Sequence, residues 1–421
     1  MTSIHFKNPL SIVDKLRMMQ EDTVFDVSDD DAACVPDFSQ IKAEFKAKPS
    51  PPKVPKIMLS NNCIFNCAYC GCRAGNDERN RYTNDPRELA EMAVQQAQPP
   101  SKVNPIGTGI FITSAICKNA DYTEELIVET VKHIRKTFAY KGYVHAKIMP
   151  GADPELIRQA GQYANRLSVN IEVAKSEGYK RIARNKNRDN ILEPMGSISK
   201  LIQIAKHEKS KYSPYFATSQ TTQMMAGAAD ETDYDILRLA NAMYNKYDLK
   251  RVYYTAFQYK NPARGYDGLS PVKTPVWRMK RLYQADRLMQ IYGFTPEDIA
   301  PDGSSFLEYD LDPKAAWALR HIDMYPVEVN TADYEELLRV PGIGTVYAQR
   351  ILKARKYCKI THDVLRMLGV KMKRAKHFMT CNGRFDGVSR GGIETYRDIL
   401  ARPLADTADN WIGGGNCVED C

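Results

Sequence analysis

Between residues 57 and 257 of this 421-residue chain, short apolar runs alternate with longer amphipathic stretches. The short runs are rich in β-branched or aromatic residues, and they predict strands at 57–60, 110–113, 144–149, 167–173, 221–226 and 252–257. The longer stretches predict helices at 86–97, 123–138, 153–165, 197–207 and 232–247. Thr123, followed by two glutamates, and Thr232, with Asp235 three residues later, are typical of helix starts.

Strands that alternate with helices predict a parallel sheet, because parallel neighbours are joined by helical crossovers. We therefore expect an α/β fold, with a partial (βα)6 TIM-like barrel as the first choice and a doubly wound sheet as the alternative. No Gly-x-Gly-x-x-Gly follows the first predicted strand, which counts against the doubly wound sheet and its dinucleotide site.

After Gly293 the strand pattern stops, and from Val327 the chain is helical and basic. These changes predict five regions along the chain. They are an N-terminal extension at 1–50, the barrel at 51–300, a connector at 301–326, a small all-α domain at 327–385 and a tail at 386–421.

The composition excludes some classes of protein. No segment approaches the roughly 18 uninterrupted apolar residues of a membrane span, and the N-terminus lacks the apolar core of a secretory signal. We therefore expect a cytoplasmic protein with no membrane partner. The chain has 10 cysteines. Since disulfide frameworks belong mainly to small secreted domains, the cluster between Cys63 and Cys72 favours metal binding over disulfides.

The spacing C-x3-C-x2-C of Cys63, Cys67 and Cys70 provides three thiolates from one loop directly after the first predicted strand. Structural zinc sites usually have four ligands, so three thiolates alone suit zinc poorly. A [4Fe–4S] cluster held by three cysteines keeps one iron open for a small molecule. A zinc loop or incidental cysteines remain the alternatives, and Cys72 is expected to be a bystander.

This loop resembles that of the radical S-adenosylmethionine (SAM) enzymes, whose motif is C-x3-C-x-aromatic-C, with Tyr69 at the aromatic position here. The resemblance implies two cofactors, a [4Fe–4S] cluster and SAM. It also implies reductive cleavage of SAM to a 5′-deoxyadenosyl radical that abstracts hydrogen from a substrate. The electron would come from a one-electron donor such as flavodoxin or ferredoxin.

The same resemblance assigns SAM contacts to residues after the second strand and along the fourth. The expected cofactor-binding residues are Tyr69, Thr113, Ser114, Ser168, Asn170 and Glu172. Ser168, Asn170 and Glu172 alternate, so a strand would point them to one face, either into a site or into solvent. His145 on the third strand has two equal interpretations, a site residue and a structural histidine. No catalytic residue is assigned.

Residues 337–351 resemble a helix-hairpin-helix, with Gly342 and Gly344 in the turn between two predicted helices. Glycines permit a positive φ and close approach of a partner backbone. The amides that open the second helix, at Thr345, would then form a phosphate site. A degenerate second copy follows at 364–378.

Between Arg350 and Lys376 the chain carries ten basic residues and one acid, Asp363, so this segment alone exceeds the net charge of +8 of the whole chain. Such a local excess predicts a face that binds the phosphate backbone of a nucleic acid. The residues expected to bind it are Gly342, Gly344, Thr345, Arg350, Lys353, Lys371, Lys373 and Arg374. A helical protein-interaction domain is the alternative.

A third stretch interleaves aromatic and basic residues at 259–266 and 277–283. It would either stack an unpaired base or form a helix that buries Trp277, Leu282 and Leu288 and keeps its arginines outside.

The barrel motifs combined with the C-terminal hairpins resemble the family of DNA modification or repair radical SAM proteins, over roughly residues 50 to 380. The resemblance implies a radical SAM enzyme that acts on DNA. The alternatives are an enzyme that modifies RNA or a small molecule, and a non-enzymatic nucleic-acid-binding metalloprotein. The substrate, the oligomeric state and the roles of Cys417 and Cys421 stay open.

Overall fold

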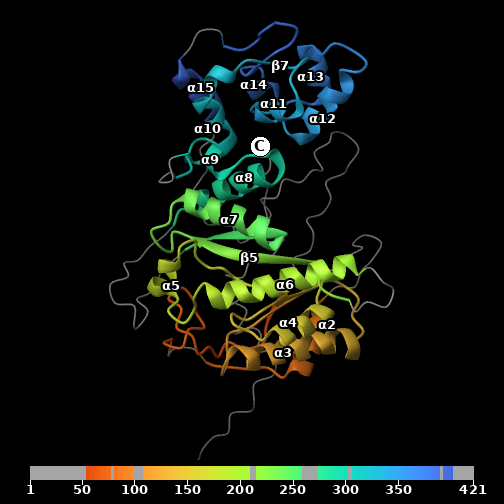
Figure 1. Ribbon diagram of the computed structural model, residues 1–421, viewed down its shortest axis with the longest axis vertical. Coiled ribbons are helices and arrows are strands. Elements are labelled where there is room, and N and C mark those ends of the chain that lie inside the picture. Colours follow the sequence, from red (N-terminus) through yellow and green to blue (C-terminus); the bar gives the residue numbers. More distant parts are fainter. Residues whose placement is uncertain are drawn as a thin grey trace, which may run out of the picture. The chain divides into compact units, whose positions relative to one another are not determined.

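The computed structural model describes residues 54–76, 80–97, 108–208, 215–257, 274–301, 306–388 and 392–401 (Figure 1). The N-terminal extension, the aromatic and basic stretch at 259–266, and the end of the tail with Cys417 and Cys421 lie outside the described residues. The chain divides into two compact units. The first holds the described residues up to Asp230 and those between Ala242 and Thr274, and the second holds those between Glu231 and Asn241 and those from Pro275 onward.

The core of the first unit is a six-stranded parallel sheet whose strand order follows the chain. The strands are β1 (Lys56–Met58), β2 (Ile110–Thr113), β3 (Val144–Lys147), β4 (Arg166–Ser168), β5 (Ser219–Ala226) and β6 (Arg251–Ala256). Each overlaps a strand predicted from the sequence. The order contains no reversal, unlike that of a doubly wound sheet. The expectation of an α/β fold with a parallel sheet is confirmed.

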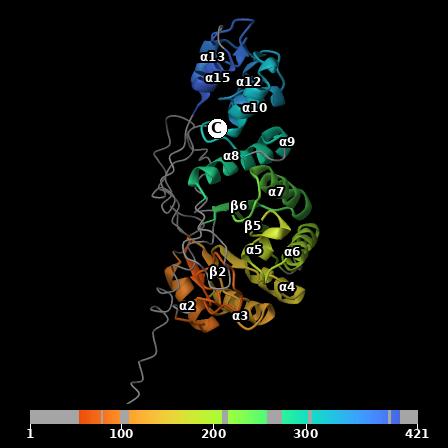
Figure 2. The same cartoon turned by 90° about the vertical axis from the view of Figure 1, so that its left-hand side faces the viewer.

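Helices connect these strands. They are α2 (Pro86–Gln96), α3 (Ala120–Lys132) with a π-helical turn at His133–Thr137, α4 (Pro154–Tyr163), α5 (Ser176–Ile182), α6 (Asp189–His207) and α7 (Asp233–Tyr247). Successive helices α2, α3, α4 and α6 pack against one another. In Figure 2 they follow one another in an arc outside the strands. The apolar residues of the strands are therefore covered by the apolar stripes of the helices, as amphipathic patterning requires.

One of the two predicted helix starts is confirmed and the other is wrong. Thr232 and Asp235 form a capping box, because the Thr232 hydroxyl accepts from the Asp235 amide and the Asp235 carboxylate accepts from the Thr232 amide. Helix α3, however, begins at Ala120, and the Asn119 side chain accepts from the Tyr122 amide as its cap. Thr123 is instead buried, and its hydroxyl donates to the Cys117 carbonyl.

The second unit is mainly helical. Its helices after α7 are α8 (Val276–Tyr292), α9 (Pro296–Ile299), α10 (Pro313–Arg320), α11 (Tyr334–Arg339), α12 (Thr345–Ala354), α13 (His362–Leu368), α14 (Met372–Ala375) and α15 (Ile393–Leu400), with a 3-10 turn at Ile322–Met324. The region is not purely helical, because β7 (Val327–Glu328) pairs in parallel with β8 (Met379–Thr380). This short ladder joins the two ends of the hairpin region.

Helix α8 differs from the expectation of a helix with exposed arginines. Leu282 and Leu288 are buried as expected, but Trp277 is only half-buried. Arg278 and Arg281, in contrast, are buried. The Arg278 guanidinium pairs with the buried carboxylate of Asp233 at 2.7 Å, while Arg281 donates to two backbone carbonyls. Burial of these charges is tolerated because each has a partner. The helix is therefore enclosed on several sides.

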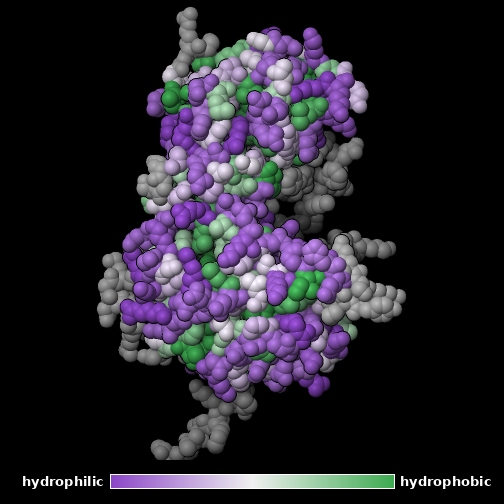
Figure 3. Space-filling view, in the orientation of Figure 1, coloured by the Kyte–Doolittle hydropathy of each residue, from purple (hydrophilic) through white to green (hydrophobic). Residues whose placement is uncertain are grey.

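The surface seen in Figure 3 is largely hydrophilic in each unit, with hydrophobic residues scattered among the polar ones. None of the helices in the described part of the chain has the length and apolar character needed to cross a bilayer.

Candidate functional site: a cysteine-lined pocket and a basic hairpin

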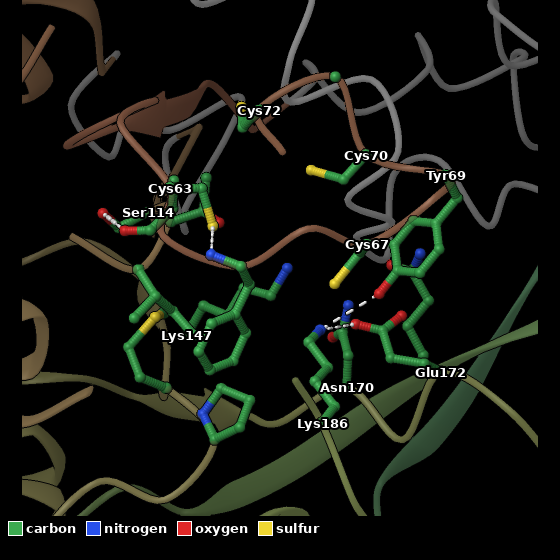
Figure 4. Close-up of a pocket in the computed structure, with 18 of the residues that line it drawn as sticks. Cys63, Cys67, Tyr69, Cys70, Cys72, Ser114, Lys147, Asn170, Glu172 and Lys186 are labelled. Atoms are coloured by element: carbon green, nitrogen blue, oxygen red, sulfur yellow. Dashed lines mark hydrogen bonds and ion pairs between the residues drawn. The ribbon is translucent and has the colours of Figure 1, made fainter. Parts of the chain in front are cut away.

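A pocket lies where the carboxyl ends of the strands in the first unit meet (Figure 4). It contains about 1070 Å³ of space free of protein atoms, its open mouth included. Every strand of the six contributes to the lining, either directly or through the residues that follow it. In parallel α/β folds, ligands bind at this end of the sheet, so its position alone marks the pocket as the candidate site.

The three predicted metal ligands, Cys63, Cys67 and Cys70, all line this pocket, and their sulfur atoms point into it in Figure 4. Cys72 lines it as well but lies to one side of the other three. The Sγ atom of Cys63 accepts from the Phe65 amide at 3.4 Å. The loop thus brings together the thiols that the sequence placed in one motif.

The cysteine loop is held by Arg81, a residue that sequence reasoning missed. Its guanidinium donates to four backbone carbonyls, at distances between 2.6 and 2.9 Å. One carbonyl precedes the cysteines and three follow Cys70; they belong to Asn61, Cys72, Arg73 and Asn76. The rigid fork of an arginine suits such multiple contacts, so Arg81 ties the two ends of the loop together.

The pocket affects the three thiols differently. Burial raises the pKa of Cys67 to about 12, although the Lys186 ammonium opposes this. Burial also raises the pKa of Cys63. A hydrogen bond from Cys72 lowers the pKa of Cys70. Metal binding requires thiolates, so a bound positive centre would have to supply the stabilisation that burial removes from Cys67.

A largely buried ion pair lies beside the thiols. The Lys186 ammonium lies 2.7 Å from the Glu172 carboxylate, and the two side chains are 12% and 4% exposed. Lys186 also donates to the Tyr69 hydroxyl at 3.2 Å. Burial alone would lower the pKa of Lys186, but the Glu172 carboxylate raises it above the ordinary value, so the ammonium stays charged.

Lys186 is also a residue that sequence reasoning missed, since nothing in the stretch between α5 and α6 distinguishes it from surface lysines. The structure brings it to the pocket because this stretch is bound to the cysteine loop. The Ala68 amide donates to the Ile182 carbonyl at 2.8 Å, and the Asn66 amide donates to the Asn185 side chain at 3.0 Å.

Four further residues expected to contact a cofactor line the pocket, namely Thr113, Ser114, Asn170 and Glu172, as does Tyr69. Ser168 does not: it is buried, and its hydroxyl is bonded to His145 Nε2 at 2.8 Å. His145 in turn stacks on Phe111 with ring centroids 4.2 Å apart, so it has a structural contact on each side.

Ser168, Asn170 and Glu172 were expected to alternate along one strand, but β4 ends at Ser168. The backbone of Glu172 is left-handed, with φ of 64°, which is uncommon for a residue with a side chain. Its amide and carbonyl both bond to β5, at Gln223 and Met225. These bonds hold the strained conformation in place, and strain of this kind often accompanies a functional site.

The residues of the pocket fit an iron–sulfur cluster and a polar ligand. Three thiols supply the donor set, and the Oγ1 atom of Thr255 in the lining is buried without a partner among the described residues. No three His, Cys, Asp or Glu side chains within the described ranges are gathered so as to hold a single metal ion. A cluster is held differently, since each thiolate binds a different iron.

In the second unit, the turn between α11 and α12 contains Gly342 and Gly344, as predicted. Gly342 has φ of +89°, and a Cβ atom there would lie 3.0 Å from the Lys371 carbonyl oxygen. Gly344 is extended, with φ of −102°, and precedes Thr345 at the start of α12 without a side-chain cap. The first amides of α12 therefore have no acceptor within the helix and no cap, which is the geometry of an anion site.

The two hairpins brace each other. Gly342 lies against the Lys371 carbonyl and against Ala375 of α14. Arg350 on α12 donates to the Leu368 carbonyl at 2.9 Å in the second turn. Gly369 in that second turn is also left-handed, with φ of +91°. Helix α11 begins with a capping box formed by Asp333 and Glu336.

The cations that were predicted to bind phosphate differ in their exposure to solvent. Lys353, Lys371 and Lys373 are exposed, and Arg350 is half-buried. Arg374 differs from the expectation, because it is buried and its guanidinium is paired with the Asp312 carboxylate. Its position on the short helix α14 gave no indication of this partner, which lies 62 residues away in the chain.

The family model described as a helix-hairpin-helix motif matches residues 325–385. The chain contains a helix-hairpin-helix motif. This agrees with the paired helices and glycine turns of that region. No protein of curated function matches the chain in sequence.

Among solved structures, the chain is similar to the FeFe-hydrogenase maturase HydG from Carboxydothermus hydrogenoformans, with 17% identity and a TM-score of 0.41 over 57% of this chain and 52% of that one. A second structure of HydG matches at 15% identity and a TM-score of 0.40, over 56% of this chain and 48% of that chain. Methylornithine synthase (PylB) matches at 14% identity and a TM-score of 0.41, over 58% and 64%. The chain thus spans less than two thirds of each of these proteins, and a likeness this distant carries no assignment of function.

Proposed function

We propose that this chain is a radical SAM enzyme that acts on DNA, in its modification or repair. The observation that carries the proposal is the convergence of Cys63, Cys67 and Cys70 on a pocket at the carboxyl ends of six parallel strands. A [4Fe–4S] cluster held by these three thiolates keeps one iron open for SAM. When bound, the cluster and SAM supply a radical that removes a hydrogen atom from the substrate. In this proposal the six βα units form a partial barrel.

The residues of the chain bind and orient these groups. Ser114, Asn170 and Glu172 present polar atoms to the pocket, where they hold the polar end of SAM. Lys186 fixes the Glu172 carboxylate through the 2.7 Å ion pair. Met58, Met149 and Met225 line the same space with apolar side chains, which exclude water from a reactive intermediate.

The helix-hairpin-helix motif binds the DNA. The uncapped amides at the start of α12 donate hydrogen bonds to a phosphate, and the exposed Lys353, Lys371 and Lys373 add positive charge. Contacts of this kind position a nucleic acid without reading its sequence. The motif therefore binds DNA of many sequences. The base that reacts is selected by the pocket.

Three further assignments belong to this proposal. The electron for SAM cleavage comes from a one-electron donor such as flavodoxin or ferredoxin. The protein acts in the cytoplasm and has no membrane partner. The proposal adopts the five regions of the sequence analysis, with the barrel at 51–300 and the hairpin domain at 327–385.

The test is anaerobic reconstitution of the full chain with iron and sulfide. We expect about four irons for each chain and a reduced-cluster electron paramagnetic resonance signal that changes when SAM is added. Cys67→Ala should lose this signal. Cys358→Ala is the matched control, because Cys358 is exposed and lies outside the pocket. Purified protein that holds zinc and no iron would favour a non-enzymatic nucleic-acid-binding protein.

A second arm separates DNA from RNA. Affinity for duplex DNA and for tRNA is measured at several salt concentrations, because phosphate contacts weaken as salt rises. We expect DNA to bind more tightly at each concentration. Tighter binding of tRNA would indicate that the substrate is RNA. Absence of salt-dependent binding to either nucleic acid would indicate a small-molecule substrate.

A further inference from the structure

The two most exposed large hydrophobic side chains among the described residues both lie in the basic segment between Arg350 and Lys376. Tyr357 is 81% exposed and Met367 is 86% exposed, whereas the next aromatic residue, Phe306, is 58% exposed. Single exposed hydrophobic residues are common on protein surfaces. Tyr357 and Met367 are of interest because they lie in the same basic segment that is expected to bind phosphates.

Tyr357 is surrounded in sequence by exposed cations. Lys353, Lys356 and Lys359 are all exposed, and Lys356 is the residue directly before Tyr357. The only acid of the segment, Asp363, is paired with Arg366 on α13. An aromatic ring among lysines, with the nearby acid already neutralised, is complementary to a strand that combines phosphates with bases.

The backbone gives Tyr357 a fixed place. The turn that ends α12 is held by the amides of Tyr357 and Cys358, which both donate to the Ala354 carbonyl, at 2.9 and 3.1 Å. The 10 residues of α12 span about 15 Å. The start of α12 and the turn at Tyr357 therefore lie at opposite ends of this helix, so a phosphate and a base can be bound at separate points of the motif.

We propose that Tyr357 is a stacking platform for an unpaired base, so that the hairpin motif prefers DNA with a single-stranded interruption to continuous duplex. The inference rests on the proposed function and narrows its substrate to DNA in which a base is already out of the stack. Bases in a duplex are covered by their neighbours on both faces, and only an unpaired one offers its face to a side chain.

The experiment compares two DNA probes of one sequence, a 20-base-pair duplex and the same duplex with one unpaired 2-aminopurine. The full chain is titrated with each probe, as wild type and as Tyr357→Ala, Tyr357→Phe and Lys353→Ala. We expect wild type to bind the interrupted probe about tenfold more tightly and to quench its fluorescence. Tyr357→Ala should lose both effects, while Tyr357→Phe keeps them because the ring is retained.

Lys353→Ala is the matched control, since loss of a phosphate contact should weaken binding to both probes equally. Because Tyr357 is 81% exposed, its substitution should leave the thermal unfolding midpoint unchanged. Equal affinity of wild type for both probes, or unchanged behaviour of Tyr357→Ala, overturns the inference and leaves the proposed function standing. Absence of salt-dependent binding to any DNA overturns the hairpin role in the proposed function, and the inference with it.

Discussion

In the pocket of the first unit, Lys186 is largely buried against Glu172, whereas in the helix-hairpin-helix motif Lys353 and Lys371 are exposed. A buried ammonium must keep its partner, because an unpaired charge in a dry site is costly. An exposed one keeps its hydration and stays available to a polyanion. The difference separates two uses of the same side chain: positioning groups within a site, and attracting a partner to a surface.

The largest expected effect follows from breaking the buried pair. Lys186→Met leaves the Glu172 carboxylate without its cation, so the free energy of unfolding should fall by about 3–5 kcal/mol. Urea unfolding of the apo chain measures this directly. Lys180→Met is the matched control, because Lys180 is exposed on α5 next to the same stretch of chain, and it should change the free energy little.

The double variant Lys186→Met/Glu172→Gln sharpens this first prediction. Removing both charges should recover part of the loss, because no unpaired ion remains. A single Lys186→Met variant as stable as Lys180→Met would show that the pair contributes nothing, and the contrast between the two units would then be wrong.

An effect of similar size concerns a buried carboxyl group of the first unit that the fold keeps neutral. Glu124 is fully buried, one carboxyl oxygen accepts from the Met149 amide at 2.9 Å, and the other has no partner among the described residues. Burial raises the pKa of Glu124 to about 8. The unfolded chain ionises at its ordinary pKa near 4.5, so between about pH 4.5 and 8 the native state holds the extra proton.

The stability contributed by the protonated Glu124 should therefore fall as pH rises through that window. Glu124→Gln, which stays neutral, should be more stable than wild type by up to about 4 kcal/mol at pH 8, with the gap closing near pH 4. Thermal unfolding across this pH range measures the gap. A gap that does not vary with pH would mean that Glu124 is ionised in the folded protein.

The smallest expected effect on stability belongs to the exposed lysines. Lys353→Ala and Lys371→Ala should each change the free energy of unfolding by less than about 0.5 kcal/mol. Each should, however, reduce the slope of the logarithm of DNA affinity against the logarithm of salt concentration by about one, because one phosphate contact is lost. A loss of stability without a change in the salt dependence of DNA binding would show that these lysines have a structural role. The contrast between Lys186 and the exposed lysines would then be wrong.

The sequence predicted the parts of the site that depend on local pattern. The six strands follow from β-branched runs between turn residues, and the cysteine loop follows from the spacing of Cys63, Cys67 and Cys70. The glycine turn of the first hairpin was likewise predictable, because Gly342 adopts the positive φ that glycine permits.

The remainder depends on partners far apart in the chain. Arg81, Lys186 and Arg374 resemble ordinary surface cations in sequence, and only the fold brings them to loop carbonyls, to Glu172 and to Asp312. The same holds for Ser168, which pairs with His145 behind the pocket. Periodicity shows which face a residue takes, but not which distant group will lie opposite it.

The most direct test of the account is the formation of 5′-deoxyadenosine by the reconstituted chain, with dithionite, SAM and an interrupted DNA duplex under anaerobic conditions. The account predicts a product that forms with wild type and with Cys358→Ala, that is absent with Cys67→Ala, and whose yield rises when DNA is added. A chain that retains a full cluster and forms no 5′-deoxyadenosine from SAM would contradict the account.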